Sequence, residues 1–512
     1  MASRWQTSVI PFEGGLVLDK PSLRLSAEQP GSAIYLENLV PDLRLRGYSK
    51  VLGYSKFSGD EVPDNSDPLS KVVGVYTLVD GSVLAFRSKK VYHSSGSAWS
   101  TLNATDLPLT SIKVRGVTYN FVGTNKSIFV DSANKPFIID NTTRSFTILS
   151  SAPSDTEGAS CVASFAGRLF FGKQNLLSYT APNTDDDFSV AAGAGVINTG
   201  DEIVALKVFK GSLLVFLKHS IKALSGDTTA NFKLETLTES NWCVSGDTIQ
   251  EVENDIVYLS QSGVRVLSDT QNNSLFQAIN VAASVNPLVV SLLKQYTQFS
   301  SCVIPSKNEY RLFFYSDSLD KGLATGLVGV QFGGQGDNSF EWSTLKGFQC
   351  FSCHSNSILG SDRVVFSSSD SFIYSMESGK SFSGEPISWA FHTPFMFFSD
   401  PTLRKTIHKV HFFGSFSNVQ DLTLSVRLDF NEAKFIQPSP ILTSISNLGA
   451  SGSIFGASVF GAATFGSSSI QRFSAQAVGA GEHFSFQLYG SGLDEEFNFN
   501  TLVLELSQQD RQ

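Results

Sequence analysis

A strand–turn–strand phrase recurs along most of this chain and constrains its fold more than any other feature. Each copy has a short apolar segment, a turn rich in Gly, Asp, Asn or Ser, and a second short apolar segment. Clear copies lie at residues 81–87, 211–224, 255–267 and 363–374. Their starts are separated by about one or three times 35 to 45 residues, which is the length range of β-propeller blades. We therefore expect an all-β chain whose repeats form a ring of small sheets around a central hole.

The second strand of several copies is apolar at consecutive positions rather than at alternate ones. Residues 213–217, for example, read Leu-Leu-Val-Phe-Leu. A strand that is apolar on both faces is buried on both faces, and stacked blades bury their middle strands in this way. We count about seven blades between residues 67 and 383, with six and eight as the alternatives.

Two further regions flank the repeats. Residues 1–66 are broken by Gly and Pro into short extended pieces, and we expect an N-terminal arm and linker that lies on another part of the structure. Residues 384–512 contain longer strand patterns, which predict a C-terminal antiparallel β-sandwich. Within the repeats, Pro287 precedes apolar residues at helical spacing, which predicts a short inserted helix near residues 280–296.

The predicted sandwich is interrupted by a Phe- and Gly-rich segment at residues 447–470. Phe455, Phe460 and Phe465 recur at a regular interval, and each is followed by Gly. Neither a strand nor a helix has that period. We interpret the segment as a low-complexity loop that presents three aromatic rings, either packed on the sandwich or docked on a partner.

The composition suits a protein that buries area against other subunits. Charged residues make up 17% of the chain, whereas about 25% is usual, and the 42 Phe residues are suited to packing between sheets. The net charge of -9 opposes ordinary nucleic-acid binding, because that needs a basic surface. An acidic wall would still let nucleic acid slide past, since it repels phosphate.

The sequence gives no sign of membrane insertion or export. No apolar run approaches the roughly 18 residues of a membrane span, and the first residues lack the apolar segment of a signal peptide. Five cysteines, an odd number, fit reduced thiols and assembly in the cytosol. We therefore expect no membrane span.

Two motifs raise the question of a cofactor or metal. Cys350-Phe-Ser-Cys353-His354 matches the attachment string of c-type haem, but on a strand residues three apart point to opposite faces, so we expect no haem. Asp185, Asp186 and Asp187 could hold calcium, although a turn with side-chain capping is the interpretation that we favour. We predict no cofactor and no resident metal.

Signatures of enzymatic catalysis are missing from the sequence. No Gly-x-Ser-x-Gly elbow lies between a strand and a helix, and no Ser-x-Asp-x-Gly-x-x-Trp box of the sialidase type occurs. Gly333-Gly334-Gln335-Gly336 is not followed by a helix, so it does not favour phosphate binding. We predict that the chain is not an enzyme.

The N-terminal segment and several internal phrases carry a family resemblance. The segment contains Phe12, Gly14 and Gly15 before Leu16, then Pro30-Gly31, Asn38 ahead of Pro41, and Gly53-Tyr54. Internal phrases at residues 167–182 and 200–226 accompany it, as do residues 403–405 and 481–486. Together these resemble the tail nozzle, or tail hub, proteins of short-tailed bacteriophages, some of which are described as packaged-DNA stabilisation proteins.

The resemblance implies a structural virion protein of the phage tail, assembled in the host cytoplasm. Such proteins form a homo-oligomeric ring, usually a hexamer, below the portal and adaptor proteins, and tail fibres or tailspikes attach at the side. Phage DNA passes through the lumen without sequence-specific binding. Our candidate interaction residues are the N-terminal Phe12, Gly14 and Gly15, the ring-bearing Phe455, Phe460 and Phe465, and the acidic Asp185, Asp186 and Asp187.

Two other functions are consistent with parts of the pattern. A receptor-binding or fibre-type tail protein would normally carry a fibrous or β-helical stretch, and none is visible. A propeller glycan hydrolase would need paired carboxylates about 5 to 9 Å apart at the mouth of the ring. The nozzle hypothesis depends on closed β-modules around an axial hole.

Overall fold

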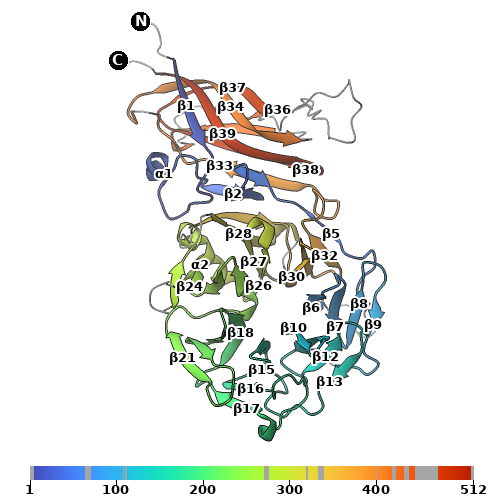
Figure 1. The fold of residues 1–512 in the computed structure, drawn as a ribbon. Coiled ribbons are helices and arrows are strands. Elements are labelled where there is room, and N and C mark those ends of the chain that lie inside the picture. Colours follow the sequence, from blue (N-terminus) through green and yellow to red (C-terminus); the bar gives the residue numbers. More distant parts are fainter. Residues whose placement is uncertain are drawn as a thin grey trace, which may run out of the picture.

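The computed structural model describes residues 5–508 apart from 64–70, 108, 110–111, 270–275, 319–320, 333–338, 399, 418–421, 432–436 and 444–470. Strands dominate, in a ring of small sheets with two larger sheets stacked beyond one side of it (Figure 1). The predicted all-β class, with a propeller and C-terminal sheets, is confirmed.

Six blades are separate four-stranded sheets. Blade one comprises β6 (Val72–Thr77), β7 (Val83–Arg87), β8 (Lys90–Ser94) and β9 (Ser100–Thr101). Blade two comprises β10 (Arg115–Phe121), β11 (Thr124–Val130), β12 (Phe137–Asp140) and β13 (Phe146–Ile148). Blade three comprises β14 (Cys161–Phe165), β15 (Arg168–Lys173), β16 (Leu176–Tyr179) and β17 (Gly195–Asn198), with the 3₁₀ turn η1 (Val190–Ala192) before β17.

The ring continues through the next two blades. Blade four comprises β18 (Ile203–Phe209), β19 (Ser212–Leu217), β20 (Ile221–Ser225) and β21 (Lys233–Thr238). Blade five comprises η2 (Gly246–Thr248), β22 (Gln250–Val252), β23 (Asp255–Ser260), β24 (Gly263–Asp269) and β25 (Phe276–Asn280). Then η3 (Ala283–Val285) and α2 (Asn286–Gln295) follow, within the range where a helix is expected, and Pro287 lies in the first turn of α2.

The sixth position of the ring belongs to a larger sheet. Blade six comprises β26 (Gln298–Ile304), η4 (Pro305–Lys307), β27 (Glu309–Tyr315), η5 (Lys321–Leu323), β28 (Thr325–Phe332) and β29 (Ser339–Lys346). Its four strands form one end of a nine-stranded sheet. Blade seven comprises β30 (Ser352–Ile358), β31 (Ser361–Ser367), β32 (Ile373–Met376) and, from the N-terminal segment, β5 (Tyr54–Lys56). Six separate four-stranded sheets and the blade-six end of the nine-stranded sheet form the ring. This is close to the predicted count of about seven blades.

Apolar clusters between neighbouring blades close the ring. In the described part of the chain, each pair of neighbours shares one cluster, including the pair formed by blades seven and one, where Val365 packs with Val72 and Val83. The middle strand β19 is buried along Leu213–Leu217, as its consecutive apolar residues predict. Burial on both faces therefore comes from blade stacking.

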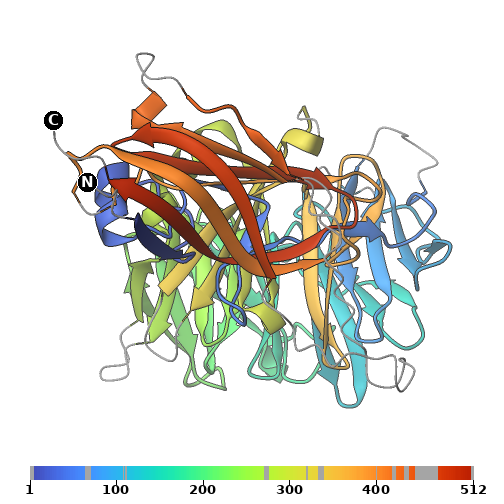
Figure 2. The ribbon, with the colours of Figure 1, turned by 90° about the horizontal axis from the view of Figure 1, so that it is seen from above.

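The C-terminal region forms two sheets that cover one side of the propeller (Figure 2). One contains β1 (Trp5–Pro11), β3 (Leu39–Pro41), β4 (Tyr48–Lys50), β34 (Lys405–Ser417), β37 (Gln471–Gly481) and β39 (Glu496–Gln508). The other extends the nine-stranded sheet through β2 (Tyr35–Glu37), β33 (Ile387–His392), β38 (Phe484–Gly492), β35 (Leu422–Leu428) and β36 (Ile441–Thr443). The helix α1 (Ser22–Glu28) and the turn η6 (Asp429–Asn431) complete the described elements.

The expected division into an arm at 1–66, a propeller at 67–383 and a separate sandwich at 384–512 needs correction. The N-terminal segment contributes strands to both the C-terminal region and the propeller, because β1, β3 and β4 join a C-terminal sheet and β5 is the fourth strand of blade seven. Between them, β2 runs parallel to β29 of blade six and antiparallel to β33. Propeller and sandwich therefore share one continuous sheet.

Asn38 is the residue at which these regions meet. It follows β2 with a positive φ of 53° and is buried. Its side chain donates a hydrogen bond of 2.8 Å to the Ser388 carbonyl of β33 and accepts one of 2.9 Å from the Lys346 amide of β29. Asn tolerates this left-handed conformation better than most residues, which explains why an amide side chain can occupy the junction.

Candidate functional site

The axis of the propeller is bridged by an ion pair at the end where the inner strands begin. Arg115, at the start of β10, donates to Asp247 of η2 through Nε–Oδ1 (2.7 Å) and Nη2–Oδ2 (2.9 Å). Its third nitrogen, Nη1, donates to the Ser160 carbonyl at 2.9 Å. Blades three and four lie between blades two and five in the ring, so this two-pronged contact spans the axis.

Blade six joins the same cluster. Lys113, just before β10, donates to the Phe299 carbonyl of β26, and its Nζ lies 3.6 Å from Asp247 Oδ2. Ser301 Oγ donates to the Asp247 carbonyl at 2.9 Å. Burial raises the pKa of Asp247, but the positive charges of Arg115 and Lys113 outweigh it and hold the pKa below its ordinary range. The carboxylate is therefore ionised and bound from both sides.

Side chains also link blades one, two and seven near the axis. The ring of His354 in β30 lies 4.0 Å from that of Tyr76 in β6, and its Nδ1 accepts the Thr77 amide at 3.2 Å. The Tyr76 hydroxyl lies 3.0 Å from Thr118 Oγ1 of β10. Burial and the charge of Lys207 lower the pKa of His354 to about 4, so the imidazole is neutral at physiological pH.

These contacts cross the axial hole that the repeat pattern predicts. A nucleic acid strand that followed the axis would have to separate Arg115 from Asp247 and Lys113 from blade six. Breaking a partly buried ion pair held by two hydrogen bonds is unfavourable.

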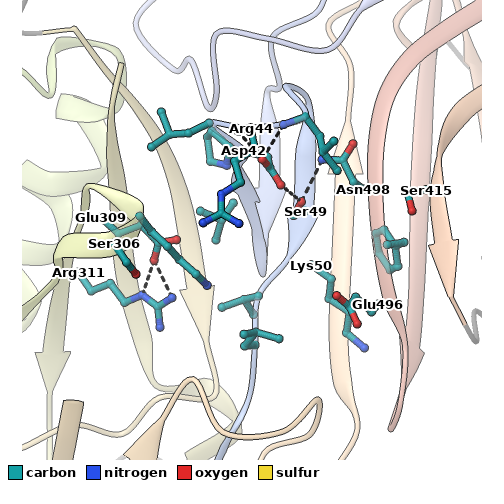
Figure 3. Close-up of a pocket in the computed structure, with 18 residues that line it drawn as sticks. Asp42, Arg44, Ser49, Lys50, Ser306, Glu309, Arg311, Ser415, Glu496 and Asn498 are labelled. Carbon is teal, nitrogen blue, oxygen red and sulfur yellow. Dashed lines mark hydrogen bonds and ion pairs between the residues drawn. The ribbon is translucent and has the colours of Figure 1, made fainter. Parts of the chain in front are cut away.

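A cleft of about 490 Å³ lies where propeller and sandwich meet (Figure 3), and we call it the seam cleft. Its floor is the hairpin of β3 and β4, residues 40–45 and 49–52; one wall is Ser306, Lys307, Glu309 and Arg311 of blade six, and the other is Ser415 and residues 496–498 of the C-terminal sheet. Its volume falls within the range of ordinary binding pockets.

Most charges around the seam cleft are already paired. Lys50 lies 3.4 Å from Glu495 with both side chains 1% exposed, and Trp389 Nε1 donates to the same Glu495 carboxylate at 3.3 Å. On the opposite wall, Arg311 donates to Glu309 at 2.7 Å and to Glu377 at 2.6 Å. These pairs fix the two walls and leave little net charge free.

Arg44 is an exposed charged group of the cleft that could bind an incoming carboxylate. It lies on the exposed turn between β3 and β4 and extends between the two walls (Figure 3). Among the described residues, no ion pair engages its guanidinium, and the nearby Asp42 carboxylate is held by Ser49 Oγ at 2.6 Å and by two backbone amides. Leu45 beside it is 54% exposed. The mouth can thus receive a carboxylate next to an apolar group.

Of the candidate residues in the N-terminal segment, Phe12 and Gly15 are buried and Gly14 is half-buried. Phe12 is 1% exposed and packs against Phe391 with ring centroids 4.7 Å apart. Gly14 and Gly15 have φ of 90° and 61°, and a Cβ on Gly15 would come within 2.8 Å of the Trp342 backbone. These residues fasten the segment to its own chain, so they do not offer a surface to a partner.

The three acidic candidates lie on the loop between β16 and β17, apart from the seam cleft. Asp185 pairs with Lys126, Asp187 Oδ1 accepts the Ser189 amide at 2.8 Å, and Asp186 is exposed. No group of three His, Cys, Asp or Glu residues in the described ranges is arranged to hold a metal ion. Phe455, Phe460 and Phe465 lie outside the described residues.

The geometric argument about the Cys-x-x-Cys-His string was wrong in one respect. Cys350 precedes β30 and is not part of a strand, so the alternation of strand side chains does not apply to it. Both cysteines pack against β26: Ser300 Oγ lies 3.3 Å from Cys350 Sγ, and Cys353 Sγ lies 3.1 Å from the Ser301 carbonyl. All five cysteines are free thiols.

Sequence reasoning missed the axial ion pair and the seam cleft. Arg115 and Asp247 are 132 positions apart, and Lys50 and Glu495 are 445 apart. No motif marks either pair.

Comparisons with known proteins leave the family open. No protein-family model and no curated protein sequence matches the chain. One similar solved structure is an extracellular domain assigned to the hybrid two component system BT4673 of B. thetaiotaomicron, at 9% identity and a TM-score of 0.40. The match covers 66% of this chain and 41% of that one. Nothing about function transfers at that level of similarity. In the described residues, none of the helices is long and apolar enough to span a membrane.

Proposed function

We propose that this chain is a structural subunit of the tail nozzle of a short-tailed bacteriophage. Several copies form a ring below the portal and adaptor proteins, and the ring closes the tail channel until the genome is ejected. Fibres or tailspikes attach to the outside of the ring. The subunit is a virion component and performs no catalysis.

The observation that carries the proposal is the way propeller and sandwich are joined into one block. The nine-stranded sheet crosses from blade six to the C-terminal region through β2, and Asn38 and the buried Lys50–Glu495 pair reinforce the junction. Domains that move relative to one another normally have small, polar interfaces. A shared sheet and core suit a part that must hold its shape against the pressure of packaged DNA.

The charge and the closed axis support a channel between subunits. The chain carries a net charge of -9, so a ring of copies would surround DNA with an acidic wall that does not trap phosphate. The Arg115–Asp247 contact obstructs the axis of each propeller. DNA would therefore follow the symmetry axis of the ring, with each propeller acting as a solid module in its wall.

Purified protein tests the proposal. Mass photometry would reveal closed oligomers of one size, and electron cryo-microscopy would resolve a ring with an open symmetry axis. Immunogold labelling of intact phage would place the protein below the portal. A chain that stays monomeric within purified tails, or that is absent from virions, would overturn the proposed function.

A further inference from the structure

The loop between β16 and β17 forms a rigid projection, residues 182–194, which we call the knob. Its base is held by Arg168, which is buried and donates Nη1 to the carbonyls of Thr180 (2.9 Å) and Gly193 (2.5 Å). The Ala181 amide donates to the Asp187 carbonyl at 2.9 Å. The Ser189 carbonyl accepts the amides of Ala192 and Ala194, each at 3.1 Å. The knob is therefore ordered before it meets any partner.

The knob presents carboxylates beside an exposed aliphatic side chain. Asp186 is exposed, and the half-buried Asp187 beside it accepts the Ser189 amide through Oδ1. Val190 in η1 is 81% exposed, and Ala191 and Ala192 next to it are exposed as well. An apolar side chain held at the tip of an ordered loop is typical of a contact surface.

The mouth of the seam cleft has the complementary composition. Arg44 offers an exposed guanidinium, whose positive charge also acts on the Asp42 carboxylate, and Leu45 offers an exposed aliphatic surface beside it. Guanidinium and carboxylate form the strongest class of hydrogen-bonded charge pair. The projecting knob thus carries carboxylates and an aliphatic side chain, which complement the guanidinium and the aliphatic side chain at the mouth of the cleft.

The two features cannot meet within one molecule. β17 and the rest of blade three lie at the end of the propeller opposite the C-terminal sheets, whereas the seam cleft lies against those sheets (Figure 1). The shared sheet prevents the sandwich from swinging toward the knob. A contact between them requires a second copy of the chain.

We propose that the knob of one copy docks into the seam cleft of the next. Asp186 and Asp187 pair with Arg44, and Val190 packs on Leu45. Such a contact uses two different surfaces, so it is heterologous and builds a ring when its rotation closes. The inference rests on the proposed function, because it supplies the contact that joins nozzle subunits.

Charge reversal tests the contact in the full-length protein. Arg44→Glu and Asp186→Arg should each raise the subunit dissociation constant at least tenfold, measured by mass photometry over a concentration series. The double variant carrying both changes should recover part of the association, because the new carboxylate at position 44 then faces the new guanidinium at position 186, while the unchanged Asp187 still opposes it. Glu239→Arg, which alters an exposed carboxylate of blade four by the same charge, should leave association unchanged.

A cross-linking experiment locates the contact. With Leu45→Cys and Val190→Cys in one chain, mild oxidation should give a ladder of linked subunits, whereas Leu45→Cys with Val122→Cys should not. Oligomers that ignore both charge reversals, or that fail to cross-link, would overturn the contact and leave the ring proposal standing. Open filaments joined by the cross-link would support the contact and overturn the ring. A wild-type chain that never associates would overturn both.

Discussion

Arg115 and Asp247 meet across the axis of the propeller through two hydrogen bonds of 2.7 and 2.9 Å. The pair joins blade two to blade five and, through Lys113, to blade six. The pair therefore crosses, at one end of the ring, the hole expected from a ring of sheets. Under the proposed function, the conduit for DNA belongs to the assembly and not to one propeller.

Removing Arg115 should destabilise the whole propeller. Arg115→Ala leaves Asp247 beside Lys113 alone. The side chains of the pair are 27% and 17% exposed, so the loss should lie between that of a surface pair and that of a buried one, about 1 to 3 kcal/mol. We expect a corresponding drop in the free energy of unfolding in urea. Arg115→Lys keeps the charge but loses the two hydrogen bonds of the guanidinium to Asp247. Its free energy of unfolding should therefore lie between those of the wild type and Arg115→Ala. Equal stability of all three proteins would mean that the axial pair contributes nothing.

The pair should also give the protein a specific sensitivity to acid. Asp247 has a lowered pKa in the folded state, so its contribution is fully present above the pKa of an unfolded Asp, about 3.9, and is lost as the pH falls below that value. Asp247→Asn should be less stable than wild type at pH 6, and the difference should narrow below about pH 4. A difference that stays constant down to pH 3 would contradict this assignment.

The Lys50–Glu495 pair should matter far more than an exposed pair. Both side chains are 1% exposed, and Lys50→Met would remove the ammonium group from the buried Glu495 carboxylate, to which the Trp389 indole also donates. We expect a loss of about 3 kcal/mol in unfolding free energy. Lys20→Met is the matched control, because Lys20 pairs with the half-exposed Glu28 and surface pairs contribute little. Similar losses in both variants would refute the distinction.

Gly15 should tolerate no side chain. Its φ is 61°, and a Cβ would lie 2.8 Å from both the nitrogen and the oxygen of Trp342, so Gly15→Ala should cost about 2 kcal/mol or more. Gly123→Ala isolates the backbone strain, since Gly123 also has a positive φ of 92° but nothing lies within 4 Å of its Cβ position. The free energy of unfolding of the Gly123→Ala control should fall by only about 1 kcal/mol. Thermal unfolding of the two variants decides whether the close packing of the N-terminal segment is real.

The repeat pattern predicted the blades because their strands are local features. Residues 213–217 are apolar at every position and form a middle strand that is buried on both faces. Pro287 begins a helix for an equally local reason, since its missing amide hydrogen is not needed in the first turn.

The connections between regions depend on contacts that no local pattern encodes. Tyr54 pairs with Met376 in blade seven, and Asn38 bonds to Ser388, each more than 300 positions away. Gly and Pro in residues 1–66 indicated short extended pieces, but a three-residue strand carries too few side chains to specify its partner. For the same reason the axial Arg115–Asp247 pair had no signal of its own.

Electron cryo-microscopy of the assembled protein, alone and in DNA-filled phage tails, tests the central claim most directly. The account predicts a closed ring of subunits with DNA density on the symmetry axis, and continuous density between Arg115 and Asp247 inside every propeller. DNA density running along the axis of a propeller, or tails in which the chain occurs as isolated monomers, would contradict it.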